Sequence, residues 1–275
     1  MSLGGYGLSL RTEDIAKFGQ VYLQRGMWNG QQLVPAAWVD SATSRWMSNG
    51  SNPASDWDQG YGFQFWRCRN GAFRGDGAHG QFCVVLPEQD AVVAITAGTR
   101  DLHGVLNVVW AKILPALQAG ALSADGVAEA KLRRKLASLA LKRSPAVEKP
   151  ALAVEIGGKR FVFPRNPQLF EAITLTPSDE DVAGTQMTVV IDGAENRVKV
   201  AGSSWTCGEL ANGPSAGKIA ASGAWTVADT FTFDVVRHQT PFAAKYRMKF
   251  SGDELKLETI PNVGPTPPVI VGRRE

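Results

Sequence analysis

Residues 75–96 read GDGAHGQFCVVLPEQDAVVAIT and contain two apolar runs joined by a short turn. The runs QFCVVLP (81–87) and AVVAIT (91–96) are rich in β-branched residues, which is typical of strands. The connection at 87–90 is short, so the two strands are predicted to be antiparallel neighbours. A third strand-like run, YGFQFWRC (61–68), precedes them. We therefore expect three core strands of one antiparallel sheet in this part of the chain.

Helical patterns flank these strands. A helix is predicted to begin at Thr12, because two acidic residues follow it and apolar residues then repeat at helical spacing up to Tyr22. The pair Asn29-Gly30 predicts a tight hairpin turn, and Pro35 favours the start of a second short helix. Residues 102–117 are predicted as one apolar helix. Helices around an antiparallel sheet indicate the α+β class.

From residue 150 onward the pattern changes to short alternating segments. TFTFDVV (230–236), KYRMKF (245–250) and ELKLETI (254–260) alternate apolar and polar residues, which predicts strands with one buried face. A Gly-Gly pair in the segment 151–163 predicts a further hairpin. Many short strands with almost no helix indicate a C-terminal antiparallel β-barrel or sandwich domain.

This change of pattern predicts three parts: residues 1–118, a helical linker at 119–149 and a β-rich domain at 150–275. Between 126 and 149 the chain has seven Lys or Arg and two Glu. We interpret this basic stretch as the solvated face of a linker helix, in preference to a membrane-surface or nucleic-acid patch.

Composition excludes several classes of function. The net charge is +3, which is too small to favour nucleic acid as a partner. Three Cys and three His without repeated spacing predict neither a disulfide framework nor a metal site, and no cofactor is expected. No run of 18 apolar residues occurs, so no membrane span is predicted.

Three segments together resemble one family of enzymes. They are GGYGLSLRTEDIAKFGQVYLQRGMWNGQQLVPAAWV (4–39), YGFQFWRC (61–68) and GAHGQFCVVLPEQDAVVAITAG (77–98). In this order they resemble the β-lactamase-related serine hydrolases, a family that includes class C β-lactamases, DD-peptidases (penicillin-binding proteins), esterases and amide hydrolases. The resemblance covers roughly residues 4–117. The remainder is only loosely similar to the lipocalin-like β domain that some members carry.

The resemblance implies a fold and a reaction. Residues 1–118 should form part of a β-lactamase/transpeptidase-like fold, an antiparallel sheet with helices. The full-length protein should transfer an acyl group to water from a small-molecule ester, amide or β-lactam. A periplasmic or secreted location is suggested by the family alone.

Two of the three elements of the family's catalytic site are missing. An acyl transfer requires an activated hydroxyl, which the family obtains from a Ser-x-x-Lys at a helix start. The chain has this pattern only at Ser215–Lys218, in a turn of the β-rich part, where we interpret it as a chance match. No Tyr-x-Asn occurs. The chain therefore reads as a C-terminal fragment, cut off downstream of its nucleophile and inactive alone.

The third element, a Lys-Thr-Gly or substitute on a core strand, has an altered counterpart before GQFCVVLPE. The resemblance assigns Lys-Thr-Gly to Gly75-Asp76-Gly77 and the oxyanion-hole N–H to the following Ala78, a role that any non-Pro residue can fill. The absence of Lys favours esterase-like or amide-hydrolase relatives over true β-lactamases. The predicted substrate-binding residues are His79, Gly80 and Gln81.

One side chain and one pair of side chains near this element allow two interpretations each. His79 contacts a substrate carboxylate or transfers a proton, or else it fills space between strand and loop. Arg74 and Asp76 form a surface ion pair, which we favour, or they bind substrate charge.

A second hypothesis concerns the β domain. It is a lipocalin-like module that binds a ligand or partner, or else its apolar side chains fill a solid core, which is the default for a small barrel. The side chains in question are Phe231, Phe233, Tyr246, Met248 and Phe250.

The strand at 91–96 predicts self-association. In the family it pairs with a strand from the N-terminal part, which this chain lacks. Its uncharged edge should therefore be exposed, and edges of this kind pair with other chains.

Overall fold

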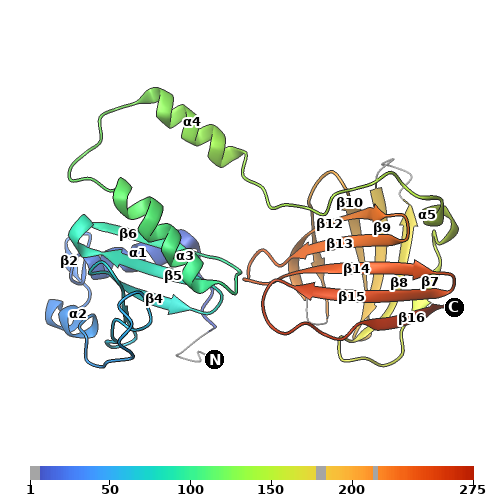
Figure 1. Cartoon of the computed structure of the whole chain (residues 1–275), viewed down its shortest axis with the longest axis horizontal. Coiled ribbons are helices and arrows are strands. Elements are labelled where there is room, and N and C mark those ends of the chain that lie inside the picture. Colours follow the sequence, from blue (N-terminus) through green and yellow to red (C-terminus); the bar gives the residue numbers. More distant parts are fainter. Residues whose placement is uncertain (1–6, 178–183, 213–215) are drawn as a thin grey trace. The chain divides into compact units, whose positions relative to one another are not determined.

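The computed structural model describes residues 7–177, 184–212 and 216–275. The chain divides into two compact units, residues 1–131 and 132–275, and the described elements of each are drawn in Figure 1. The observed fold class is the predicted one. Helices and a small antiparallel sheet form the first unit, and an antiparallel barrel dominates the second.

The first unit contains a four-stranded antiparallel sheet in the order β3-β4-β5-β6. The predicted strands at 81–87 and 91–96 are confirmed. The predicted strand at 61–68 is reduced to two residues, because Tyr61 forms only isolated bridges, to Met47 and Trp66. The strands are β3 (Trp66–Arg67), β4 (Phe73–Gly77), β5 (Gln81–Leu86) and β6 (Ala91–Ile95).

Both faces of this sheet are covered, which explains the continuous apolar run of β5. Phe82, Val84 and Leu86 belong to one buried cluster, together with Leu106. Val85 belongs to a second cluster on the other face. Alternating residues of a strand point to opposite faces, so a strand buried on both faces has no polar positions.

Helices supply the cover. The predicted helix at Thr12 and the predicted hairpin at Asn29-Gly30 are both present. The helical elements of this unit are α1 (Thr12–Leu23), α2 (Ala36–Ala42), η1 (Pro87–Gln89), α3 (Leu102–Val108), η2 (Val109–Ile113) and η3 (Leu114–Ala116), and the hairpin is β1 (Met27–Trp28) with β2 (Gln31–Gln32). The helix α4 (Gly126–Ala137) has no buried residue and spans the boundary between the two units.

Two local features set the packing of these helices. A Cβ at Gly19 would lie 2.6 Å from Val92 Cγ1, so only glycine lets α1 approach the sheet this closely. The single helix predicted at 102–117 is instead divided into α3, a π-helical turn and a 3₁₀ turn. The last turn contains Pro115, which has no N–H for an α-helical hydrogen bond.

The second unit is a ten-stranded antiparallel barrel in the order β10-β9-β8-β7-β16-β15-β14-β13-β12-β11 (Figure 1). Of the two predicted forms, barrel and sandwich, the C-terminal domain is therefore a barrel. The strands are β7 (Arg160–Val162), β8 (Phe170–Pro177), β9 (Gly184–Ile191), β10 (Ala194–Ala201), β11 (Thr206–Leu210), β12 (Gly217–Val227), β13 (Thr230–Val236), β14 (Ala243–Ser251), β15 (Glu254–Pro261) and β16 (Ile270–Arg274).

Side-chain hydrogen bonds bridge the seam of the barrel, where β10 meets β11 and β12. Ala211 N donates to Asn196 Oδ1 at 2.6 Å, and Ser222 Oγ donates to Ala201 O at 2.8 Å. The barrel is therefore nearly closed.

The hairpin predicted at 151–163 is wrong in its first half. Residues Ala151–Glu155 form the helix α5, because Pro150 precedes a run of strong helix formers. Ala153 and Ile156 are buried in the barrel core. Gly158 has a φ of +74° and follows the helix, which is the role of a C-terminal glycine. Its N–H bonds to Leu175 O, so α5 covers the end of the barrel where β8 finishes.

The segment before α5 contacts the barrel. Ser144 N donates to Asp234 Oδ2 at 2.7 Å, and Val147 N donates to Trp225 O at 2.8 Å. Arg143 also donates to Gly202 O. The linker bounds 119–149 and the domain bounds on either side stay predictions. Within the described residues, no helix is long and apolar enough to cross a membrane.

Candidate functional site

The seven predicted site residues lie together on one hairpin, β4–β5 of the first unit. Gly77 pairs with Gln81, which leaves a three-residue turn of Ala78, His79 and Gly80. Ala78 is exposed at this turn. His79 and Gly80 have φ angles of +65° and +90°, the left-handed conformation that closes three-residue hairpins.

Neighbouring loops hold the turn in place. His79 O accepts a hydrogen bond from Thr99 N at 3.1 Å, and Gln81 Nε2 donates to Ala97 O. A Cβ at Gly80 would lie 3.1 Å from the Cβ of Ala97, so the backbone there has little room. The side chain of Gln81 is thus engaged with the protein.

Arg74 and Asp76 form an ion pair, as favoured, but the pair is buried and not on the surface. Arg74 Nε lies 2.9 Å from Asp76 Oδ2, and their side chains are 0% and 11% exposed. Burial raises the pKa of Asp76, and the Arg74 guanidinium opposes that rise. Trp57 stacks at 4.5 Å on the guanidinium. Arg74 is therefore part of the core beneath the hairpin.

A second buried carboxylate, Asp56, was not identified from the sequence. Its side chain is 0% exposed and accepts from Arg69 N at 3.0 Å, Arg69 Nη2 at 2.7 Å and Trp110 Nε1 at 2.9 Å. Its backbone carbonyl accepts from Arg74 Nη1 at 2.9 Å. Asp56 thereby connects the loop between α2 and β3, the start of β4 and the η2 turn. In the sequence it lies within a loop of turn residues, where no periodic pattern signals burial.

Burial alone would raise the pKa of Asp56, but the bonds from Arg69 and Trp110 hold it below its usual value. The carboxylate is therefore ionised at neutral pH. The structure supports a role in fixing the hairpin.

The two buried thiols are unsuited to nucleophilic chemistry. Burial raises the pKa of Cys68 and of Cys83 to about 11. A thiol rather than a thiolate is then present at neutral pH, and the thiolate is the reactive form. Cys83 is therefore an inert buried residue.

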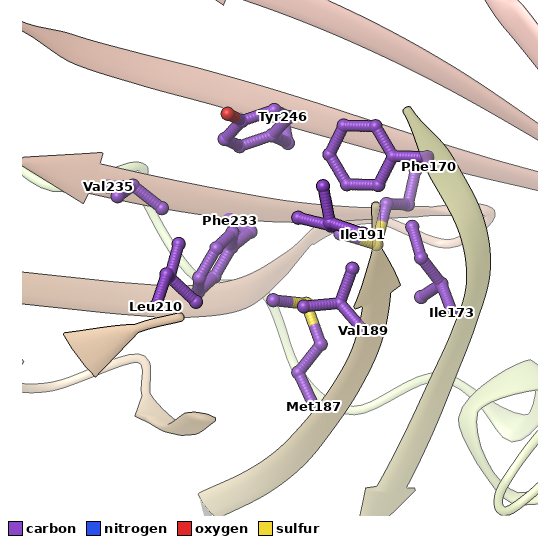
Figure 2. Close-up of a pocket in the computed structure, with 10 residues that line it drawn as sticks. Phe170, Ile173, Met187, Val189, Ile191, Leu210, Phe233, Val235 and Tyr246 are labelled. Atoms are coloured by element: carbon purple, nitrogen blue, oxygen red, sulfur yellow. The ribbon is translucent and has the colours of Figure 1, made fainter. Parts of the chain in front are cut away.

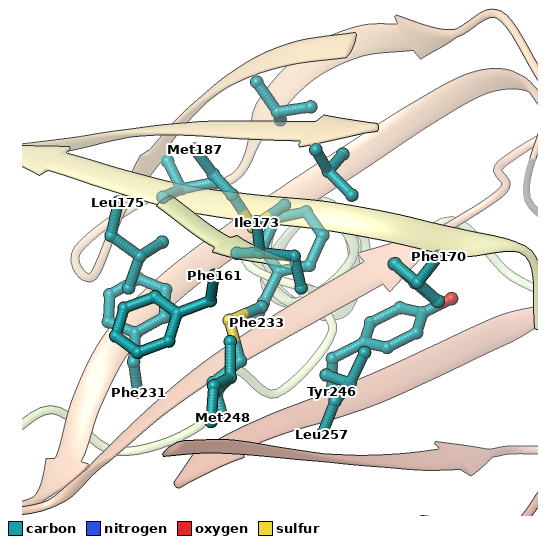
Figure 3. Packing of buried hydrophobic residues seen from close by; sticks show 14 of the residues in the cluster. Phe161, Phe170, Ile173, Leu175, Met187, Phe231, Phe233, Tyr246, Met248 and Leu257 are labelled. Carbon is teal, nitrogen blue, oxygen red and sulfur yellow. The ribbon is translucent and has the colours of Figure 1, made fainter. Parts of the chain in front are cut away.

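The interior of the barrel is nearly filled. Phe231, Phe233, Tyr246, Met248 and Phe250 all belong to one buried cluster, and Figure 3 shows most of them interlocked with residues of β8 and β9. The remaining internal cavity measures about 20 Å³, which is room for about one water molecule. The residues around it are apolar (Figure 2).

A larger pocket of about 300 Å³ lies at the barrel mouth, the end where β8 begins and β15 finishes. This volume is at the lower limit of small-molecule sites. No periodic pattern predicted it, although the segment 261–268 is conspicuously rich in Pro. The pocket is lined by Pro167, Gln168, Phe170, Ile191, Val235, Arg237, Phe242, Ala243, Ala244, Tyr246, Thr259, Pro261, Asn262, Val263, Pro265, Pro267 and Pro268.

Comparisons with known proteins divide along the same two units. The family model Beta-lactamase matches residues 3–118. No curated protein matches the chain.

Solved structures similar to the chain include fatty-acid-binding proteins. One from Drosophila melanogaster brain has 9% identity and a TM-score of 0.34, covering 43% of this chain and 98% of its own. The extracellular fatty acid binding protein As-p18 has 10% identity and a TM-score of 0.37, and the match covers 49% of this chain and 100% of As-p18. The fatty-acid-binding protein from Manduca sexta has 10% identity and a TM-score of 0.34, and the match covers 44% of this chain and 98% of that protein.

Proposed function

We propose that residues 3–118 are the C-terminal part of a β-lactamase-related serine hydrolase domain and contribute its third-motif hairpin. The family match over these residues carries the proposal. It is supported by the hairpin itself, on which Gly75, Asp76 and Gly77 precede the exposed Ala78. The N–H of Ala78 would serve as an oxyanion donor, and His79, Gly80 and Gln81 would lie along a substrate. The small-molecule substrate would be an ester, amide or β-lactam.

The hairpin favours an ester or amide over a β-lactam. No Lys stands at positions 75–77, and the charged residue there, Asp76, is already paired with Arg74. The site therefore offers no cation at this position for the carboxylate of a β-lactam.

We expect the 275-residue chain to show no hydrolytic turnover, because neither a Ser-x-x-Lys at a helix start nor a Tyr-x-Asn is present. Ser215 lies outside the described residues, and Lys218 is on strand β12. Without the nucleophile, only weak stabilisation by backbone donors would remain. The assay is hydrolysis of a chromogenic cephalosporin and of p-nitrophenyl acetate, with intact-mass detection of acylation. A stoichiometric adduct that disappears in Ser215→Ala would refute the expectation.

We also propose that the chain self-associates through strand β6. Among the described strands, β6 pairs only with β5, and its sequence AVVAI has neither charge nor Pro to block further pairing. Light scattering at micromolar concentration should give about twice the monomer mass for a two-fold dimer. Placing a charge at the exposed position that follows the strand, in Thr96→Lys, should reduce the mass, whereas a monomeric wild type would contradict the proposal.

The barrel supports a second candidate function, binding of a small ligand at its mouth. The observation that favours it is the 300 Å³ pocket above a filled interior. A merely structural barrel would not require such a pocket. Its apolar lining with a few convergent polar groups is typical of small-molecule sites.

A further inference from the structure

The floor of the mouth pocket limits the depth to which a ligand can enter. Phe170, Ile191, Val235 and Tyr246 line both the mouth pocket and the 20 Å³ cavity below it. The rings of Phe170 and Tyr246 meet edge to face at 5.8 Å, and Figure 2 shows them beside each other among the residues that line the inner cavity. These side chains form a layer between pocket and interior. A ligand is therefore confined to the mouth.

Hydrogen bonds hold the walls of the pocket in place. Gln168 Nε2 donates to Pro268 O at 2.9 Å, and Gln168 Oε1 accepts from Thr259 Oγ1 at 2.6 Å. Asn262 Nδ2 donates to Pro241 O, and Asn262 Oδ1 accepts from Ala243 N, both at 2.8 Å. These amides fasten the rim loops. The pocket is thus formed before a ligand arrives, which lowers the entropic cost of binding.

One charged side chain lines the pocket. Among its lining residues, all of which the structure describes, Arg237 is the one that carries a charge at neutral pH, and no carboxylate is present. Its guanidinium lies 5.2 Å from the centre of the Phe242 ring. Arg237 is half-buried, so water screens its charge less than at an open surface. A guanidinium in this setting matches the two oxygens of a carboxylate.

We propose that the mouth pocket binds a small amphiphile, a medium-chain or aryl carboxylate whose anionic group pairs with Arg237. The apolar body lies against Phe170, Tyr246 and the rim prolines. A volume of 300 Å³ lies at the lower limit of small-molecule sites, so the ligand is small. Longer chains would project into solvent. This inference rests on the proposed binding function of the barrel.

Calorimetric titration of the intact chain tests the head group. Octanoate, octanol and octyltrimethylammonium are compared as probes. Octanoate should bind at least about tenfold more tightly than the other two, and Arg237→Gln should remove most of that advantage, because hydrogen bonds to charged groups are among the stronger ones. Arg247→Gln is the matched control, as Arg247 pairs with Glu258 and is exposed. Equal binding of octanol and octanoate would overturn the carboxylate while leaving binding itself established.

The length of the carboxylate's alkyl chain tests how deep the pocket is. Affinity should rise from butanoate to decanoate and then change less than about threefold up to tetradecanoate, because added methylenes stay in water. Phe170→Ala should open the floor and shift the optimum to longer chains. Phe170→Leu supplies the same comparison if the Ala variant unfolds. A continued rise in wild type would overturn the depth limit, and failure of every probe to bind would remove the binding function together with this inference.

Discussion

Replacement of Asp56 by Asn is expected to lower the free energy of unfolding of the N-terminal unit by about 3–5 kcal/mol, the usual cost of breaking a buried ion pair. Asn keeps the shape but leaves the partly buried guanidinium of Arg69 without its counter-charge. Asp40→Asn is the matched control, because Asp40 and Arg25 form an exposed pair. That change should cost about 0–1 kcal/mol. Urea unfolding of both variants measures the difference.

The effect of Asp56→Asn should depend on pH. The pKa of Asp56 is held below its usual value in the folded chain. Its stabilising contribution is therefore fully present above the unfolded pKa of about 3.9 and is lost as pH falls through the lower folded value. The difference between wild type and variant should stay constant from about pH 7 to 5 and shrink below pH 4. A difference that is unchanged at pH 3 would contradict the ionised state of Asp56.

Phe231→Ala is expected to destabilise the barrel by about 3–5 kcal/mol, since a large buried ring leaves a cavity when removed. The Phe231 ring lies 5.7 Å from that of Trp225. It also packs on the backbone at Gly223, where a Cβ would lie 2.8 Å from its Cζ. The control is Val227→Ala, because Val227 is on the neighbouring strand and 53% exposed. Its cost should stay below about 0.5 kcal/mol.

The two variants together test the division of the chain. If the units unfold separately, Asp56→Asn should move one transition in a calorimetric scan, and Phe231→Ala the other. A single transition that both variants shift would show that the units unfold as one, against the predicted domains at 1–118 and 150–275.

The sequence by itself determined several of the strands. Alternation between apolar and polar residues identified β13, β14 and β15, and unbroken apolar runs identified β5 and β6. These predictions succeeded because side-chain direction repeats every two residues along a strand. The resemblance to the serine hydrolases assigned Gly75 to Gln81 to one predicted site, and the β4–β5 hairpin keeps these contiguous residues together.

Only the tertiary structure decided the features that join distant residues. Asp56 accepts a hydrogen bond from Trp110, which is 54 positions away in the sequence. Thr259 donates one to Gln168, which is 91 positions away. The helix α5 replaced an expected strand, because its burial against the barrel core added to its local helical preference. The barrel mouth likewise arises where the β7–β8, β13–β14 and β15–β16 loops converge. Such contacts depend on how complete helices and strands pack against one another. Local periodicity in a sequence does not indicate which distant side chains that packing brings together.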